Sequence, residues 1–170
     1  RLGTANAASI GLESIKNIGD IVIILYGDTP FIEYSSLNKM IDVIKNGNSV
    51  CVLAFELLDE SNMYGRLKTS GNDLLEIVEY KDASEDERKI KLCNSGVIAI
   101  SGSKIKNLLK KINNNNASNE YYLTDIVKIA KSENLNCSFV KINDNDEIVG
   151  INSRIELSEA EKIFQNKIRN

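Results

Sequence analysis

The chain has 170 residues, of which 42% are hydrophobic and 26% are charged, a composition typical of one soluble globular domain with its own core. Its net charge of -3 and isoelectric point near 5.2 give no general attraction for nucleic acid or for an anionic membrane. Any phosphate would have to be bound by local groups, helped by a cation. The sequence contains no histidine, which excludes Ser-His-Asp and Cys-His catalysis and favours phosphoryl or nucleotidyl transfer, where positioning and a metal supply most of the catalysis.

Targeting and cysteine usage point to a cytoplasmic protein. No apolar run approaches the ~20 residues of a membrane-spanning helix, and the first residues lack the pattern of a signal peptide. The three cysteines, Cys51, Cys93 and Cys137, are odd in number and far apart, as expected for reduced thiols in a core. Without a linker or an internal repeat, residues 1–170 are expected to form one domain.

The first half of the chain alternates between helical and strand patterns. The continuous branched run Ile21-Val22-Ile23-Ile24-Leu25 is typical of a strand buried on both faces, as in a parallel sheet. The turn residues Ser70-Gly71-Asn72-Asp73 separate two short strand patterns and predict a hairpin. The elements expected in this half are helices over about 5–18 and 35–45, strands over 21–25 and 49–55, and hairpin strands over 66–69 and 74–79.

The second half continues the alternation after a segment of mixed charge over 82–91, which is typical of a solvated loop or an exposed helix face. Its expected elements are strands over 96–100 and 137–142 and helices over 104–112 and 123–132. A last helix begins at Ser153, whose hydroxyl can cap it while Glu156 completes a capping box.

These elements predict an α/β fold: a Rossmann-like, mostly parallel sheet with helices on both faces and an inserted β-hairpin. Ligands of such sheets bind beyond the carboxyl ends of the strands. Asp28 follows a predicted strand and the pair Tyr26-Gly27, so its carboxylate could hold magnesium at that edge. Gly-Asp-Thr-Pro is also ordinary turn chemistry, and both interpretations remain open at this point.

An amide-rich loop, Asn113-Asn114-Asn115-Asn116, leads into Glu120-Tyr121-Tyr122-Leu123-Thr124-Asp125. Asn side chains offer donors and acceptors, and phenols offer flat apolar faces with a polar tip, a combination that suits a ligand with many hydroxyls. The sequence therefore indicates a sugar. A chain rich in Asn could contain such a run by composition alone, but composition does not explain the block that follows it.

Four separated blocks resemble the uridyltransferase half of the bacterial bifunctional N-acetylglucosamine-1-phosphate uridyltransferase and glucosamine-1-phosphate acetyltransferase. They are Leu2-Gly3-Thr4-Ala5, Leu25-Tyr26-Gly27-Asp28 with Pro30, the stretch from Tyr64-Gly65-Arg66 to Val78-Glu79 and Lys81-Asp82-Ala83, and the Asn-rich run leading to Gly150-Ile151-Asn152-Ser153-Arg154. The resemblance covers nearly the whole chain but only the middle and rear of the family's first domain. It implies the nucleotide-diphospho-sugar transferase fold, truncated at its N-terminus.

The resemblance also implies roles for individual residues. In the family, the residues matched by Asp28 and Asn152 coordinate Mg²⁺. Gly3 and Thr4 match a pair that contacts the nucleotide, and Tyr26 and Gly27 complete the wall around the nucleotide sugar. The residues that match the lining of the N-acetylglucosamine pocket are Gly65, Glu79, Asn94, Tyr122 and Thr124.

The implied reaction transfers uridylyl from UTP to N-acetylglucosamine 1-phosphate, giving UDP-N-acetylglucosamine for cell-wall and lipopolysaccharide synthesis, and pyrophosphate. The family's Gly-rich phosphate loop and its acetyltransferase half, through which the complete protein would form a trimer, have no counterpart in these residues, so little turnover is expected from them alone. Arg1, Asn6 and Ser118-Asn119 depart from the family pattern without removing a metal ligand or a sugar contact. Two alternatives remain: a nucleotidyltransferase for another sugar 1-phosphate, and a non-catalytic domain that binds nucleotide sugars.

Overall fold

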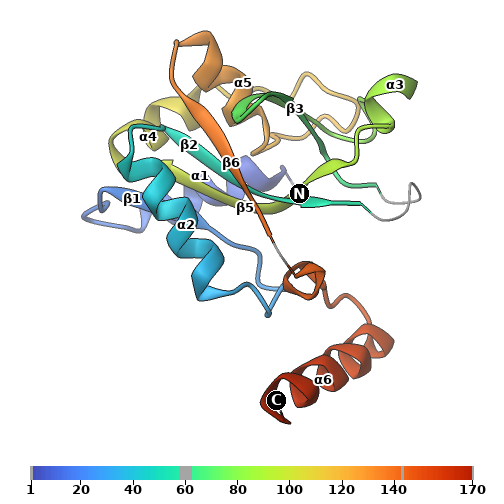
Figure 1. Ribbon diagram of the computed structural model, residues 1–170. Helices are drawn as coiled ribbons and strands as arrows, with labels where there is room; N and C mark the ends of the chain where they lie inside the picture. Colours follow the sequence, from blue (N-terminus) through green and yellow to red (C-terminus); the bar gives the residue numbers. More distant parts are fainter. Residues whose placement is uncertain (1, 58–62, 143, 170) are drawn as a thin grey trace.

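The computed structural model describes residues 2–57, 63–142 and 144–169 (Figure 1). Its helices are α1 (Thr4–Glu13), α2 (Tyr34–Lys45), α3 (Glu85–Arg88), α4 (Gly102–Lys110), α5 (Asp125–Ser132) and α6 (Arg154–Arg169), with a short 3-10 helix, η1 (Asn145–Ile148). Its strands are β1 (Ile21–Ile24), β2 (Val50–Glu56), β3 (Arg66–Ser70), β4 (Asp73–Val78), β5 (Leu92–Ser101) and β6 (Cys137–Lys141).

The longest strand, β5, organises the sheet. β2 runs antiparallel along one edge of β5, from Val50 opposite Ile100 to Glu56 opposite Leu92. β1 and β3 pair antiparallel with β5 at the two ends of its other edge. β6 extends the sheet beyond β2, and β4 extends it beyond β3, giving the order β4-β3-β5-β2-β6 with β1 beside β5.

The expectation of a mostly parallel sheet is wrong, because β2 and β6 form the one parallel pair among the strand pairs of the described residues. β1, β2 and β6 do share one direction, as βαβ units predict. However, β5 lies between β1 and β2 and runs the opposite way. A continuous apolar run indicates burial on both faces, but it carries no information about the direction of the neighbouring strands.

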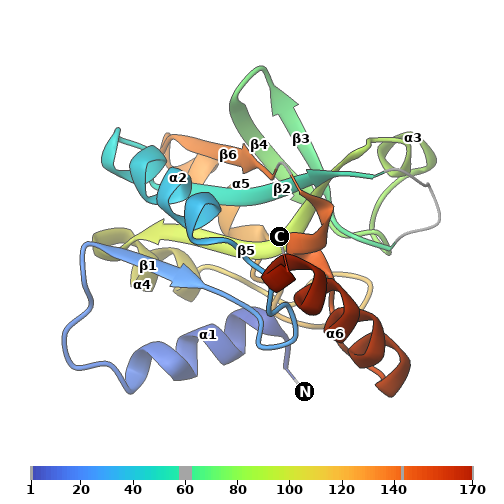
Figure 2. The same ribbon diagram turned by 60° about the horizontal axis from the view of Figure 1, so that its bottom comes forward.

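Helices cover both faces of the sheet, as predicted (Figure 1, Figure 2). On one face α2 packs Met40 and Ile44 against inward residues of β2 and β5 such as Leu53 and Val97. On the other face α1, α4 and α5 form a second core with the alternate residues of the same strands. β2 and β5 are therefore buried on both sides, which explains why they read as near-continuous apolar runs.

Several helices and strands begin or end at other residues than the sequence predicted. The first helix ends at Glu13 instead of near Ile18, and β1 is only half-buried along its length. β5 begins at Leu92, so Asn94 lies inside a strand and not before one. The hairpin formed as predicted, with β3 opposite β4. The charged segment 82–91 contains the short exposed helix α3, which a capping box at Ser84 begins.

No helix of the described ranges is long and apolar enough to cross a membrane. The three cysteines are buried and free, which confirms them as core thiols. Burial raises the pKa of the Cys51 and Cys137 thiols to about 12, so neither is a thiolate near neutral pH.

Replacing Met40 tests the packing of α2, because this side chain is fully buried between the helix and the sheet. Met40→Ala should lower the free energy of unfolding by about 2–5 kcal/mol through lost burial and the cavity left behind. Lys39→Ala, one position earlier on the exposed face, should change it by less than about 0.5 kcal/mol. Urea unfolding of the two variants measures both, and equal losses would show that α2 does not pack as described.

Candidate functional site

Six of the predicted site residues line one cavity of about 240 Å³, which we term the central cavity. Residues from five separate segments of the chain meet there. The predicted residues in its wall are Tyr26, Asp28, Gly65, Glu79, Asn94 and Asn152. The turn after β1 therefore does bring Asp28 to a cavity at the open edge of the sheet, where α/β folds bind ligands.

The loop before α6 is tied directly to the turn that carries Asp28. The Ile151 N–H donates to the Asp28 carbonyl oxygen at 2.9 Å. Next to it, the Asn152 N–H donates to the Glu156 carboxylate at 2.7 Å, and the Ser153 hydroxyl accepts from the Glu156 N–H at 3.2 Å. The hydroxyl cap predicted at Ser153 is thus present. The Glu156 carboxylate extends the cap to Asn152, and this hydrogen bond lowers the pKa of Glu156.

Asn94 faces the central cavity because β5 bulges beside it. The register between β2 and β5 shifts between Val52 and Ala54, so the three β5 residues 95–97 stand against the single β2 residue Leu53. Inside the bulge the Gly96 N–H donates to the Asn94 amide oxygen at 3.0 Å. The Asn94 N–H in turn donates to the Gly65 carbonyl oxygen at 2.9 Å. The Asn94 side chain is thereby oriented, with its amide nitrogen left as the group that can donate to a ligand.

Glu79 lies where three cavities meet. Besides the central cavity it lines one of about 320 Å³ with Asn115, Asn116 and Tyr122, and one of about 250 Å³ that Tyr122 also lines. The Thr124 hydroxyl donates to the Glu79 carboxylate at 2.8 Å. Burial raises the pKa of Glu79, the Thr124 hydrogen bond offsets part of that rise, and nearby acidic residues add to it. The residues matched to the sugar pocket thus gather around one partly buried carboxylate.

The Asn-rich run mostly holds its own loop together. The Asn116 amide oxygen accepts from the N–H groups of Ser118 and Glu120, and the Asn113 amide oxygen accepts from Asn115. Asn115 and Asn116 still line the 320 Å³ cavity. The side chains of Asn113 and Asn116 therefore mainly stabilise their own loop. Tyr122, which follows in the chain, lines the same cavity, and Thr124 contacts Glu79.

Gly3 and Thr4 lie against the segment that follows this loop. Tyr121 exchanges backbone hydrogen bonds with Leu2 and Ala5, at 2.8 and 2.9 Å, and the Thr4 hydroxyl accepts from the Leu123 N–H at 3.0 Å. Gly3 has a φ of 102°, and a Cβ there would lie 2.6 Å from the Tyr121 carbonyl oxygen, so the close approach requires glycine.

Thr4, in the first sequence block, is linked to the central cavity by a hydrogen bond with Tyr26, which lines that cavity. Burial raises the pKa of Tyr26 and the Glu79 carboxylate adds to the rise, while a hydrogen bond with Thr4 acts the other way. Gly27 lies in the exposed turn between Tyr26 and Asp28. Seven of the eleven predicted residues therefore line one of these cavities. Thr4 and Thr124 are hydrogen-bonded to residues that do, Gly27 adjoins two of them in the chain, and Gly3 packs against Tyr121.

Other residues of the site were missed in the sequence. Ser95, Gly96 and Tyr64 also line the central cavity. Arg66 is fully buried and its guanidinium donates to the Tyr64 carbonyl oxygen at 2.8 Å and to the Cys93 sulfur at 3.1 Å, which fixes the 63–65 segment against β5. Only Gly96, a glycine within an apolar strand pattern, gave a signal of a bulge or a close approach.

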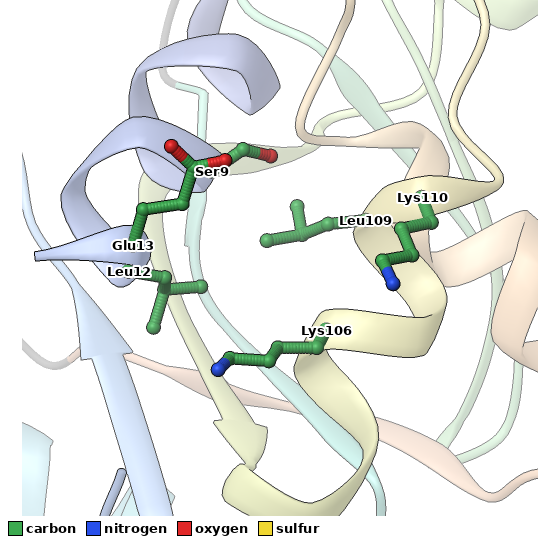
Figure 3. Close-up of a pocket in the computed structure, with 6 residues that line it drawn as sticks. All are labelled: Ser9, Leu12, Glu13, Lys106, Leu109 and Lys110. Carbon is green, nitrogen blue, oxygen red and sulfur yellow. The ribbon is translucent and has the colours of Figure 1, made fainter. Parts of the chain in front are cut away.

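A further cavity, of about 250 Å³, lies between α1 and α4 (Figure 3). Leu12 and Leu109 form an apolar floor, with Lys106 and Lys110 beside it. It contains none of the predicted site residues.

The central cavity contains oxygen donors of the kind that hard cations prefer. Asp28 contributes a carboxylate and Asn152 an amide, and both side chains are exposed at the cavity. The described residues contain no cluster of three or more His, Cys, Asp or Glu able to hold a metal. Magnesium usually takes one or two protein carboxylates or amides and keeps waters or phosphates as its other ligands, so this pair of donors fits it.

Comparisons with known proteins bear on this site. No family model matches the chain. Over 99% of its length, the chain is 44% identical to the bifunctional protein GlmU of Roseobacter denitrificans and 42% identical to that of Xanthobacter autotrophicus. It spans 37% of the length of these relatives. The resemblance inferred from the four sequence blocks is thereby confirmed.

Solved structures share the fold at low sequence identity. A nucleoside-diphosphate-sugar pyrophosphorylase from Vibrio cholerae has a TM-score of 0.70 at 14% identity, covering 95% of this chain and 66% of that chain. CMP:2-keto-3-deoxy-manno-octonic acid synthetase complexed with CTP has a TM-score of 0.62 at 12% identity, covering 96% and 68%. The Rossmann-like α/β fold is therefore confirmed.

The partly buried Glu79 predicts a pH-dependent stability. Because its pKa in the folded chain lies above the ordinary value of 4.5, the folded state binds more protons than the unfolded state between these two values. The wild-type chain should therefore gain stability relative to Glu79→Gln as the pH falls from 7 toward 4.5, and lose that advantage as the pH rises. Urea unfolding across this range measures the difference.

Glu87 provides a control of opposite sign. Its pKa is lowered to about 2, chiefly by the hydrogen bond from the Ser84 N–H. The wild-type chain should lose stability relative to Glu87→Gln as the pH falls from 4.5 toward 2. A flat pH profile for the Glu79→Gln difference, alongside the expected Glu87→Gln profile, would show that Glu79 is not desolvated.

Proposed function

Because the chain is homologous along 99% of its length to a segment of the bifunctional protein GlmU, we propose that it forms part of a nucleotidyltransferase domain in a longer protein. The proposed reaction transfers uridylyl from UTP to N-acetylglucosamine 1-phosphate, giving UDP-N-acetylglucosamine and pyrophosphate. The observation that carries the proposal is the central cavity. Asp28 and Asn152, the proposed metal ligands, line it together with Glu79 and Asn94, the proposed sugar-binding side chains.

In this proposal Asp28 and Asn152 hold Mg²⁺. The described residues that line the central cavity include the carboxylates of Asp28 and Glu79 but no lysine or arginine. A phosphate placed there would be repelled unless a cation balanced the charge. When bound, Mg²⁺ neutralises charge on the phosphate oxygens, which is the local cation that the acidic composition of the chain requires.

The protein residues would position the sugar. The Asn94 amide nitrogen is available to donate, because its oxygen already accepts from Gly96. The Glu79 carboxylate accepts from Thr124 with one oxygen, and its remaining lone pairs can accept from sugar hydroxyl or amide groups. Tyr26 and Tyr122 offer flat faces beside these groups, a combination that suits a sugar ring.

No protein nucleophile is needed for the chemical step. A phosphate oxygen of the sugar 1-phosphate attacks the α-phosphorus of UTP in line, forming the new P–O bond as the bond to the β-phosphate oxygen breaks and pyrophosphate leaves. The contribution of the chain is to hold the sugar phosphate in the attacking geometry. This role fits a site made of carboxylates, amides and hydroxyls.

The proposal extends to the whole protein. Residues 1–170 would be one part of its uridyltransferase domain, with little turnover on their own. The triphosphate site and an acetyltransferase domain, which would form a trimer, would lie in other parts of a cytoplasmic enzyme. A nucleotidyltransferase for another sugar 1-phosphate is the second candidate, because one fold neighbour, from Bacillus anthracis, is named as a glucose-1-phosphate thymidylyltransferase.

Removing the proposed metal ligands tests the mechanism. In the full-length protein, Asp28→Ala or Asn152→Ala should reduce Mg²⁺-dependent formation of UDP-N-acetylglucosamine on the order of 100-fold or more, because charge stabilisation at the phosphates is lost. Asp42→Asn, an exposed carboxylate on α2, should leave turnover unchanged. Full turnover of Asp28→Ala at limiting Mg²⁺ would reject the metal assignment.

Sugar specificity is tested by calorimetry with the full-length protein and Mg²⁺. UDP-N-acetylglucosamine should bind more tightly than UDP-glucose, and Asn94→Ala should weaken its binding about 10-fold, as expected when a buried polar contact to the ligand is lost. Asn107→Ala, on the exposed side of α4, is the matched control. Equal affinity for the two nucleotide sugars would favour the second candidate.

A further inference from the structure

Gly96 lies in the bulge of β5 with a φ of +94°, and the ring of Tyr26 packs directly on it. A Cβ at Gly96 would lie 2.3 Å from Tyr26 Cε2 and 2.6 Å from Cδ2, distances that real Cβ contacts do not reach. We propose that Gly96 is a positioning residue for nucleotide-sugar binding, because its missing side chain sets the place of the Tyr26 ring in the central cavity. This inference rests on the proposed function.

The position of the Tyr26 ring affects the shape of the central cavity, because this side chain forms part of the cavity wall. It lines the same cavity as Asp28 and Glu79. The Thr29 hydroxyl donates to the Tyr26 carbonyl oxygen at 3.2 Å, which fixes the backbone of the turn. With the backbone held, a side chain at Gly96 would displace the ring from its place on β5 and so change the wall of the cavity that Tyr26 lines.

The contact also connects two motifs that are far apart in the sequence. Tyr26 belongs to the turn that carries Asp28, and Gly96 belongs to the bulge that carries Asn94. The Tyr26 ring on Gly96 therefore sets how closely the metal side of the cavity approaches the sugar side. An error of about 1 Å in such positioning can cost on the order of 100-fold in an enzyme.

Two effects of Gly96→Ala can be separated, because the chain contains a matched glycine. Gly47, in the turn after α2, has a φ of +97°, and a Cβ there would meet nothing within 4 Å. Gly47→Ala therefore reports the cost of placing a side chain in left-handed backbone. Gly96→Ala reports the same backbone cost plus the displacement of Tyr26.

The test is a double-mutant cycle in the full-length protein, with thermal unfolding and the affinity for UDP-N-acetylglucosamine measured for each variant. Both alanine variants should lower the melting temperature, but Gly47→Ala should bind as the wild type does. Gly96→Ala should weaken binding about 10-fold or more. In a Tyr26→Ala background the further effect of Gly96→Ala on affinity should shrink to about 2-fold or less.

A structural readout decides the geometry independently of affinity. In NMR spectra of protein with isotope-labelled tyrosine rings, the Tyr26 signals are identified as those missing from the Tyr26→Phe variant. Their chemical shifts should change in Gly96→Ala but not in Gly47→Ala. Unchanged Tyr26 signals, or an affinity loss that persists in the Tyr26→Ala background, would overturn the inference. Failure of the wild type and of Gly47→Ala to bind the nucleotide sugar would instead reject the proposed function.

Discussion

The two-sided pairing of β5 is the constraint on which the rest of the structure depends. Buried backbone groups have to be hydrogen-bonded, and β5 satisfies its own through β2 on one edge and β1 and β3 on the other. The chain segments before and after the hairpin are thereby held on one strand. Where the pairing with β2 is interrupted, at the bulge, the N–H groups of Gly96 and Val97 donate to the side chains of Asn94 and Ser95 instead of to β2, and residues 94–96 line the central cavity. The interruption of the sheet therefore forms one wall of the site.

Short polar contacts between distant segments complete that site. Ile151 is bonded to Asp28, Leu123 to Thr4, and Thr124 to Glu79. Each joins parts of the chain separated by tens of residues, and each involves a predicted site residue or its neighbour. These contacts are individually modest in free energy. Their effect is to remove freedom from the loops, so that side chains on separate loops keep fixed relative positions, which is what positioning catalysis requires.

The sequence predicted local structure well wherever one pattern determined it. The period of α2, the Gly71 turn of the hairpin and the cap at Ser153 are local signals, and each formed. The direction of β5 and its early start at Leu92 depend on pairing partners far away in the chain, which periodicity does not encode. For the site, the resemblance supplied the residues, whereas their physical connections could not be predicted. No local pattern tells that Asn94 is oriented by Gly96, or that Tyr26 needs a glycine opposite.

Charge links the parts of the proposed mechanism. The described walls of the central cavity contain Asp28 and Glu79 without a basic side chain, and burial already raises the pKa of Glu79. Adding a sugar phosphate would bring more negative charge into this region, so in the proposed function metal and phosphate have to stabilise each other there. Such coupling is reciprocal: if the cation raises the affinity for the phosphate by some factor, the phosphate raises the affinity for the cation by the same factor. In the proposed function two exposed oxygen donors would then be sufficient, because the substrate would supply the remaining ligands and the metal would be bound firmly only in its presence.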